Sequence, residues 1–187
     1  PDFSALESAA AQSADQRTRV LALIGNLVFA WSNNESMFIY LLMILLRTDL
    51  QSAAVVFMTL NTTRARLDLI RRLAKSKVGE PLMLRRLERM IERFNDCTKV
   101  RNDFNHCIYQ VDASGMITHT SVLRLRETKS TVEIDEMRPF DDKRMRELTK
   151  TIKALGLLNR ELWALLPDLD GAVARQRQKL PDQKLPD

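Results

Sequence analysis

The segment LRRLERMIERFNDCTKVRNDFNH, residues 84–106, has the clearest helical periodicity in the chain. Its apolar residues recur at steps of three and four positions, which places them on one face of a helix. They are Leu84, Leu87, Met90, Ile91 and Phe94, and Cys97, Thr98 and Arg101 extend the same stripe. The pattern predicts a long amphipathic helix that packs on other helices. It should begin at Glu80-Pro81, because proline suits a first helical turn.

The same kind of periodicity predicts a mainly α fold, a helical bundle of four to five helices. Residues 16–46 indicate one long helix, or two with a kink near residues 32–34. Residues 50–60 are apolar on most sides, as in a central helix of a bundle, and Thr48-Asp49 offers this helix an N-cap. The polar residues 61–63 indicate either a kink or a restart of the helix, and the helical face that follows them should end at Lys77-Val78-Gly79. A last helix should begin at residue 142 and end at Pro167, since proline interrupts helical hydrogen bonding.

The composition changes between the last two helices. Residues 107–111 and 116–125 are rich in Ile, Val, Thr and Tyr, and the turn-forming run Asp112-Ala113-Ser114-Gly115 separates them. These features predict a small β-hairpin insertion at about 107–136, before the last helix, with room for a third short strand at 131–134.

Length and composition indicate one soluble globular domain. The chain has 187 residues, of which 45% are hydrophobic and 28% charged, and a single core is feasible at this size. We expect a flexible N-terminal segment at 1–15, a helical domain at 16–167 with the hairpin inside it, and a disordered, proline-punctuated tail at 168–187.

Membrane and secretory classes are not expected. The most apolar stretch, residues 37–46, ends at Arg47 and is about half as long as the roughly 20 residues of a membrane span. Residues 1–18 lack the hydrophobic run of a signal peptide. Cys97 and Cys107 form neither a disulfide framework nor a zinc pattern. We therefore expect a cytoplasmic protein whose two thiols are reduced.

Positive charge is concentrated in one part of the chain. The net charge is +5, yet residues 62–101 alone contain twelve Lys or Arg against five Asp or Glu. A basic sector of this kind suits a polyanionic partner such as RNA, and the alternative is a solvated helix face with internal pairing. The candidate RNA-binding residues are Arg64, Arg66, Arg71, Arg72, Arg93 and Lys99.

The strongest chemical motif is Arg101-Asn102-Asp103-Phe104-Asn105-His106, at the end of the long helix. Asn102 and His106 stand one helical turn apart on one face, with Arg101 beside them. An arginine can hold two phosphate oxygens and stabilise transition-state charge. A histidine can accept a proton from a ribose 2′-hydroxyl, and the asparagine can orient either group. The trio therefore suits a phosphodiester substrate.

This arrangement of helices, with Arg-Asn-x-x-x-His at the end of a long helix, a connector and a final helix, resembles the HEPN superfamily. The resemblance covers about residues 16–166 and implies a helical bundle that dimerises with two motifs face to face. Many such proteins are metal-independent endoribonucleases that leave a cyclic phosphate, and others are toxins, defence components or non-catalytic binding modules. The resemblance assigns catalytic roles to Arg101, Asn102 and His106, and a weaker one to the acidic Glu35 on the first helix. The connecting hairpin is longer than the usual connector.

Two functional hypotheses follow. The first is a homodimeric HEPN-like endoribonuclease that needs no metal or other cofactor, because no His, Cys or carboxylate cluster has metal-ligand spacing. The second is a non-catalytic helical module that binds RNA or a protein partner through the basic sector. A purely structural alternative pairs Arg101 with Asp96 or Asp103, and uses His106 to cap the helix carbonyls.

Overall fold

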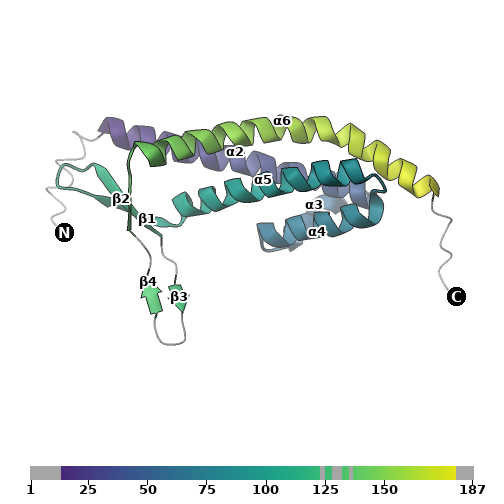
Figure 1. The fold of residues 1–187 in the computed structure, drawn as a ribbon, viewed down its shortest axis with the longest axis horizontal. Helices are drawn as coiled ribbons and strands as arrows, with labels where there is room; N and C mark the ends of the chain where they lie inside the picture. The colour runs from purple at the N-terminus through teal and green to yellow at the C-terminus, as the bar shows by residue number, and fades with distance from the viewer. Residues whose placement is uncertain (1–13, 123–124, 128–131, 135–136, 180–187) are drawn as a thin grey trace. The chain divides into compact units, whose positions relative to one another are not determined.

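The computed structural model of the chain describes residues 14–122, 125–127, 132–134 and 137–179 (Figure 1). Most of the segment predicted to be flexible at 1–15, and residues 180–187 of the predicted disordered tail, lie outside these ranges. Parts of the predicted hairpin insertion also lie outside them.

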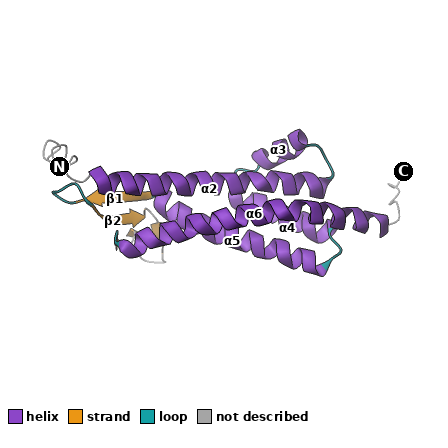
Figure 2. Ribbon diagram, turned by 90° about the horizontal axis from the view of Figure 1, so that it is seen from above, coloured by secondary structure: helices purple, strands orange, loops and turns teal. Residues whose placement is uncertain are grey.

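The described residues form five helices and a small amount of antiparallel β-structure before the last helix, which confirms the predicted mainly α class (Figures 1 and 2). The helices are α2 (Ala14–Leu46), α3 (Leu50–Thr59), α4 (Thr63–Lys77), α5 (Pro81–Asn105) and α6 (Asp142–Lys179). The strands are β1 (Cys107–Val111), β2 (Ile117–Val122), β3 (Leu125–Glu127), β4 (Val132–Ile134) and β5 (Met137–Pro139).

Three helices begin at side chains that cap them. The carboxylate of Asp49 accepts a hydrogen bond from the Ser52 N–H at 2.9 Å, as predicted for α3. The Thr62 hydroxyl accepts one from the Ala65 N–H at 3.1 Å at the start of α4. Asp141 accepts one from the Arg144 N–H at 3.0 Å at the start of α6. Each cap satisfies a backbone donor that the first helical turn leaves without a partner.

The chain divides into two compact units. Unit 1 consists of Pro1–Trp31 and Cys97–Ala154, and unit 2 of Ser32–Asp96 and Leu155–Asp187. Each of α2, α5 and α6 contributes residues to both units, because the division falls within these helices.

Unit 1 contains the sheet. Strands β1, β2 and β5 form an antiparallel sheet in the order β1-β2-β5, and β3 pairs with β4 in a separate hairpin. The turn between β1 and β2 is built on Asp112, whose carboxylate accepts hydrogen bonds from Ser114 and Met116, and Gly115 adopts a positive φ of 76°, which favours glycine. The predicted turn is therefore confirmed. The expected third strand at 131–134 is described at Val132–Ile134, where β4 pairs with β3. Strand β5 joins the main sheet.

The sheet of unit 1 is fastened to helix α2 through one side chain. The Gln16 amide donates to the Ile117 carbonyl at 3.2 Å and accepts from the Ile117 N–H at 2.9 Å. The core of unit 1 includes the fully buried Phe104 and Leu148. Because backbone groups need partners when they leave solvent, this amide pairs with the backbone of Ile117, which lies beyond the residues of β2 that pair with β5.

Unit 2 has an aliphatic and aromatic core. The rings of Phe38 and Phe94 lie 4.9 Å apart, and Leu41, Leu42 and Leu45 are completely buried around them. Asn34 is 1% exposed and donates a hydrogen bond to the Leu155 carbonyl at 3.0 Å. This bond gives a buried polar side chain a partner. Residues 32–34 are helical, since α2 includes all residues from Ala14 to Leu46 as one element.

The prediction that Pro167 ends the last helix is wrong. Helix α6 continues through Pro167 to Lys179. A proline inside a helix costs about 3 kcal/mol, but Leu169, Ala172 and Val173 are buried beyond it. Ion pairs also hold this segment, one of them between Asp168 and Arg86 at 2.7 Å. Tertiary packing in unit 2 thus offsets the local penalty, and residues 168–179 are helical.

The prediction that residues 50–60 form a central helix is also wrong. Only Ala53 and Phe57 of α3 are buried, while Val55 is 62% and Met58 64% exposed. The helix is short, so one buried face suffices to attach it.

Among the described residues, no single helix combines the length and apolar character that a membrane span requires. The pair α2 and α3 reaches those values only when joined across the sharp bend between them.

Candidate functional site

The Arg-Asn-x-x-x-His motif lies in unit 1, where α5 ends. Arg101 and Asn102 belong to the last turns of the helix, and His106 is the first residue after it. The His106 N–H donates to the Asn102 carbonyl at 3.0 Å, which closes the last helical turn. The His106 side chain is exposed, and those of Arg101 and Asn102 are half-buried. The predicted spacing therefore places the imidazole at an accessible helix end.

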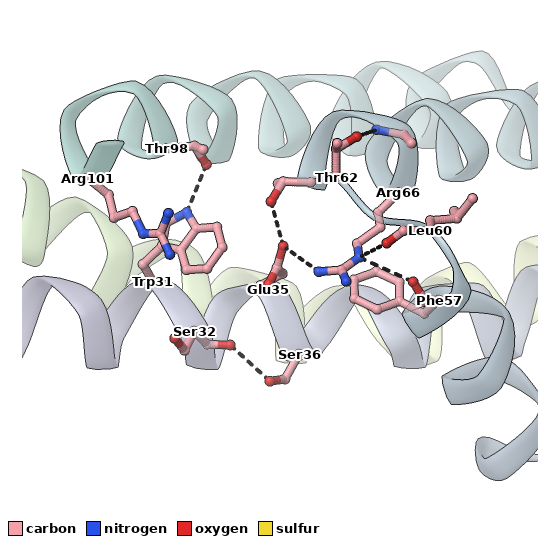
Figure 3. Close-up of polar contacts among 12 residues, drawn as sticks. Trp31, Ser32, Glu35, Ser36, Phe57, Leu60, Thr62, Arg66, Thr98 and Arg101 are labelled. Carbon is pink, nitrogen blue, oxygen red and sulfur yellow. Dashed lines mark hydrogen bonds and ion pairs between the residues drawn. The ribbon is translucent and has the colours of Figure 1, made fainter. Parts of the chain in front are cut away.

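Arg101 is oriented by two neighbours: Trp31, which lies next to it in Figure 3, and Asn102. Its guanidinium carbon lies 4.1 Å from the centroid of the Trp31 ring system, and Nη1 donates to the Asn102 Oδ1 at 2.8 Å. The buried Trp31 indole in turn donates to the Thr98 hydroxyl at 2.8 Å. The Nε of Arg101 is buried and has no hydrogen-bond partner among the described residues. A guanidinium stacked on an aromatic face is stabilised by the ring quadrupole, so this side chain is positioned before any ligand arrives.

The sequence patterns do not identify Trp31 and Thr98 as members of the site. Trp31 lies on the buried face of α2 and is 5% exposed. No local pattern indicates that this buried indole faces Arg101, because the two residues come from different helices. The position of Thr98 three residues before Arg101 on α5 was the one available signal.

The spacer residues of the motif also make specific contacts. Phe104 is buried, and the Arg144 guanidinium carbon lies 4.1 Å from its ring centroid. Asp103 forms an ion pair with Arg138 at 3.5 Å. The Phe104 carbonyl accepts a hydrogen bond from the Tyr109 hydroxyl at 2.8 Å. The helix end that carries His106 is therefore anchored to β1, β5 and α6.

Two groups on β1 have altered acidities. Burial raises the pKa of the Tyr109 hydroxyl well above its ordinary value, and burial also raises the pKa of the Cys107 thiol. Desolvation disfavours the charged form of each group. Both groups therefore stay protonated at neutral pH and serve as hydrogen-bond donors next to the motif.

Glu35, the weaker catalytic candidate, belongs to unit 2. Its carboxylate accepts a hydrogen bond from the Thr63 hydroxyl at 2.7 Å. It also pairs with the Arg66 guanidinium at 3.0 Å (Figure 3). Arg66 also donates to the carbonyls of Phe57 and Leu60, at 3.2 and 3.0 Å. Glu35 and Arg66 are 15% and 16% exposed. These contacts join α2, α3 and α4 within unit 2, and they give Glu35 and Arg66 a structural role.

The other candidate RNA-binding residues differ in their surroundings. Arg64 and Arg72 are exposed on α4. Arg71 pairs with Glu88 and Asp68, and the exposed Arg93 pairs with Glu161. Lys99 is exposed on α5 in unit 1. Pairing lowers the charge that a phosphate would meet, so Arg64 and Arg72 are the strongest candidates on α4.

No group of three or more His, Cys, Asp or Glu residues in the described parts of the chain could hold a metal ion.

The protein-family models, curated proteins and solved structures with which the chain was compared contain no match to it. Its function must therefore be inferred from the residues themselves.

Proposed function

We propose that this chain is a HEPN-like, metal-independent endoribonuclease that acts as a homodimer. One observation carries the proposal: the Arg101 guanidinium is held between Trp31 and Asn102, at the helix end that exposes His106. A positioned cation and an accessible imidazole at the same helix end are suited to phosphodiester chemistry. Surface arginines that serve only solubility need no such aromatic support.

The proposed reaction uses the RNA's own 2′-hydroxyl as the nucleophile. His106 accepts the 2′-hydroxyl proton while the 2′-oxygen bonds to the adjacent phosphorus. The bond from phosphorus to the 5′-oxygen breaks, and that oxygen leaves with a proton donated by the second motif of the dimer. Arg101 stabilises the charge that develops on the phosphoryl oxygens. The products are a 2′,3′-cyclic phosphate and a 5′-hydroxyl.

An exposed apolar stripe on α2 supports the proposed dimer. Leu21 and Phe29 are 66% and 68% exposed, and Gly25 lies midway between them. Residues at intervals of four share one face of a helix. A Cβ at Gly25 would meet no atom within 4 Å, so a partner helix has room to approach closely there. This stripe belongs to unit 1, as the motif does.

We expect Phe29→Glu to convert the dimer into a monomer and to abolish cleavage, because a charge would be buried in the proposed interface. The monomer should keep its helical content, since Phe29 makes little contact within its own chain. Light scattering after size exclusion measures the mass. Val55→Glu, at an exposed apolar position on α3, is the matched control. A wild-type protein that is monomeric at micromolar concentration would contradict the composite site.

The second candidate function is a non-catalytic module that binds RNA through α4. Arg64 and Arg72 favour this function, because both are exposed on α4. It shares the binding step with the nuclease, so RNA cleavage separates the two functions.

RNA affinity should fall steeply with salt, because bound basic groups displace condensed counterions. The double variant Arg64→Glu/Arg72→Glu should weaken binding at every salt concentration. For single-stranded RNA, it should also reduce the slope of log affinity against log salt by about 0.7 for each phosphate that is no longer neutralised. Fluorescence anisotropy with a labelled oligonucleotide gives the slope, and Arg160→Glu on α6 is the control. Salt-independent binding would remove α4 as an RNA-binding surface.

A further inference from the structure

A basic cleft lies at the start of α6 in unit 1. Its volume is about 610 Å³, within the range of roughly 300–1,000 Å³ that small-ligand pockets occupy. Two acidic side chains line it, Asp141 and Glu147, against five basic ones: Arg138, Lys143, Arg144, Arg146 and Lys150. The local excess of three positive charges predicts an anionic ligand.

Arg144 is the most unusual residue of this cleft. It is only 9% exposed, and its guanidinium carbon lies over the Phe104 ring, 4.1 Å from the centroid. Nη1 donates to the Glu147 carboxylate. Nε and Nη2 are buried and have no hydrogen-bond partner among the described residues. Leaving charged donors buried without a partner is unfavourable, so an acceptor in the cleft would stabilise this arrangement.

The two acidic side chains of the cleft already have hydrogen-bond partners within the protein. Asp141 caps α6 by accepting the Arg144 N–H at 3.0 Å, and this backbone hydrogen bond lowers the pKa of the Asp141 carboxyl. Glu147 is engaged with Arg144. Lys143, Arg146 and Lys150 are exposed at the cleft. The cleft therefore retains exposed cations around a buried guanidinium, near the positive end of the α6 dipole.

We propose that this cleft binds a phosphate group, with the buried Arg144 as its fixed donor and the exposed Lys150 and Lys143 as further cations. Guanidinium groups present parallel N–H donors that match phosphate oxygens. The spacer residues of the motif hold the cleft in place, because Phe104 supports Arg144 and Asp103 pairs with Arg138. The phosphate belongs to a free phosphate compound or to an RNA strand. Phosphate binding in this cleft does not require the proposed nuclease activity.

Isothermal titration of the full chain at low salt tests the site with three probes: inorganic phosphate, a 5′-mononucleotide and a single-stranded RNA. We expect saturable binding of at least one probe. Lys150→Gln should weaken it roughly tenfold, as loss of a charge-assisted hydrogen bond does. Lys153→Gln, on the same helix outside the cleft, should leave it unchanged. Binding of RNA alone assigns the site to phosphodiesters, and binding of the small probes assigns it to free phosphate.

Glu147→Gln provides the sharper test, because it should increase affinity. The substitution removes a negative charge from the cleft and weakens the bond that occupies Arg144, whereas a merely structural ion pair predicts lower stability and no gain in binding. His106→Ala should leave phosphate binding intact, which separates failure of this site from failure of the nuclease. No saturable binding of any probe, equal losses in Lys150→Gln and Lys153→Gln, or no tighter binding by Glu147→Gln would overturn the proposal.

Discussion

We expect His106→Ala to lower the rate of RNA cleavage by about 10² to 10⁴, which is the usual contribution of general acid–base catalysis. The side chain is exposed at the end of α5, so its removal should change the melting temperature little. Gel analysis of a labelled single-stranded RNA measures the rate, and calorimetry measures stability. Asn105→Ala, at the exposed neighbouring position, is the matched control and should cleave normally.

Arg101→Ala should cause a comparable loss of rate, but it should also reduce stability by roughly 1–2 kcal/mol because the stack on Trp31 disappears. Arg101→Lys keeps the charge and lacks the planar fork, so it should remain impaired. The double variant with His106→Ala should be scarcely slower than either single variant, since the two groups act as a unit.

Cleavage should persist in EDTA, because the proposed chemistry uses no metal. A wild-type dimer that leaves varied single-stranded RNAs intact would contradict the nuclease. Normal cleavage by His106→Ala would also contradict it, and the motif would then be a structural helix end.

The largest stability effect is expected from Glu35→Ala. The substitution would leave the Arg66 guanidinium, 16% exposed, without its carboxylate. Breaking a buried ion pair costs about 3–5 kcal/mol, and the residual exposure reduces our expectation to about 2–4 kcal/mol. For a protein of this size, that loss corresponds to a melting temperature lower by roughly 5–15 °C.

Two comparisons make this stability test specific. Glu88→Ala removes a more exposed partner from Arg71, with 40% of the Glu88 side chain accessible, and should cost less than about 1 kcal/mol. The double variant Glu35→Ala/Arg66→Met should recover much of the loss, because it no longer buries an unpaired charge. A Glu35→Ala protein that melts normally but cleaves RNA poorly would instead support a catalytic role for Glu35.

Local patterns were sufficient for much of the fold. The apolar stripe from Leu84 to Phe94 predicted α5, and Asp49 predicted the start of α3, because periodicity and caps depend on neighbouring residues alone. The turn at Asp112–Gly115 was predictable for the same reason. The Arg101–His106 motif was also visible as a local spacing along one helix.

Contacts between distant segments decided the rest. Pro167 lies inside α6 because buried residues and ion pairs beyond it outweigh its local preference. Glu35 and Arg66 are engaged with each other, Trp31 supports Arg101, and Arg144 rests on Phe104, although each pair is far apart in the sequence. Residue type and spacing reveal which side chains can carry charge or bind phosphate. Only the packing of helices determines which of those charges meet a partner inside the protein, because pairing energies depend on distance and burial, which the order of residues does not specify.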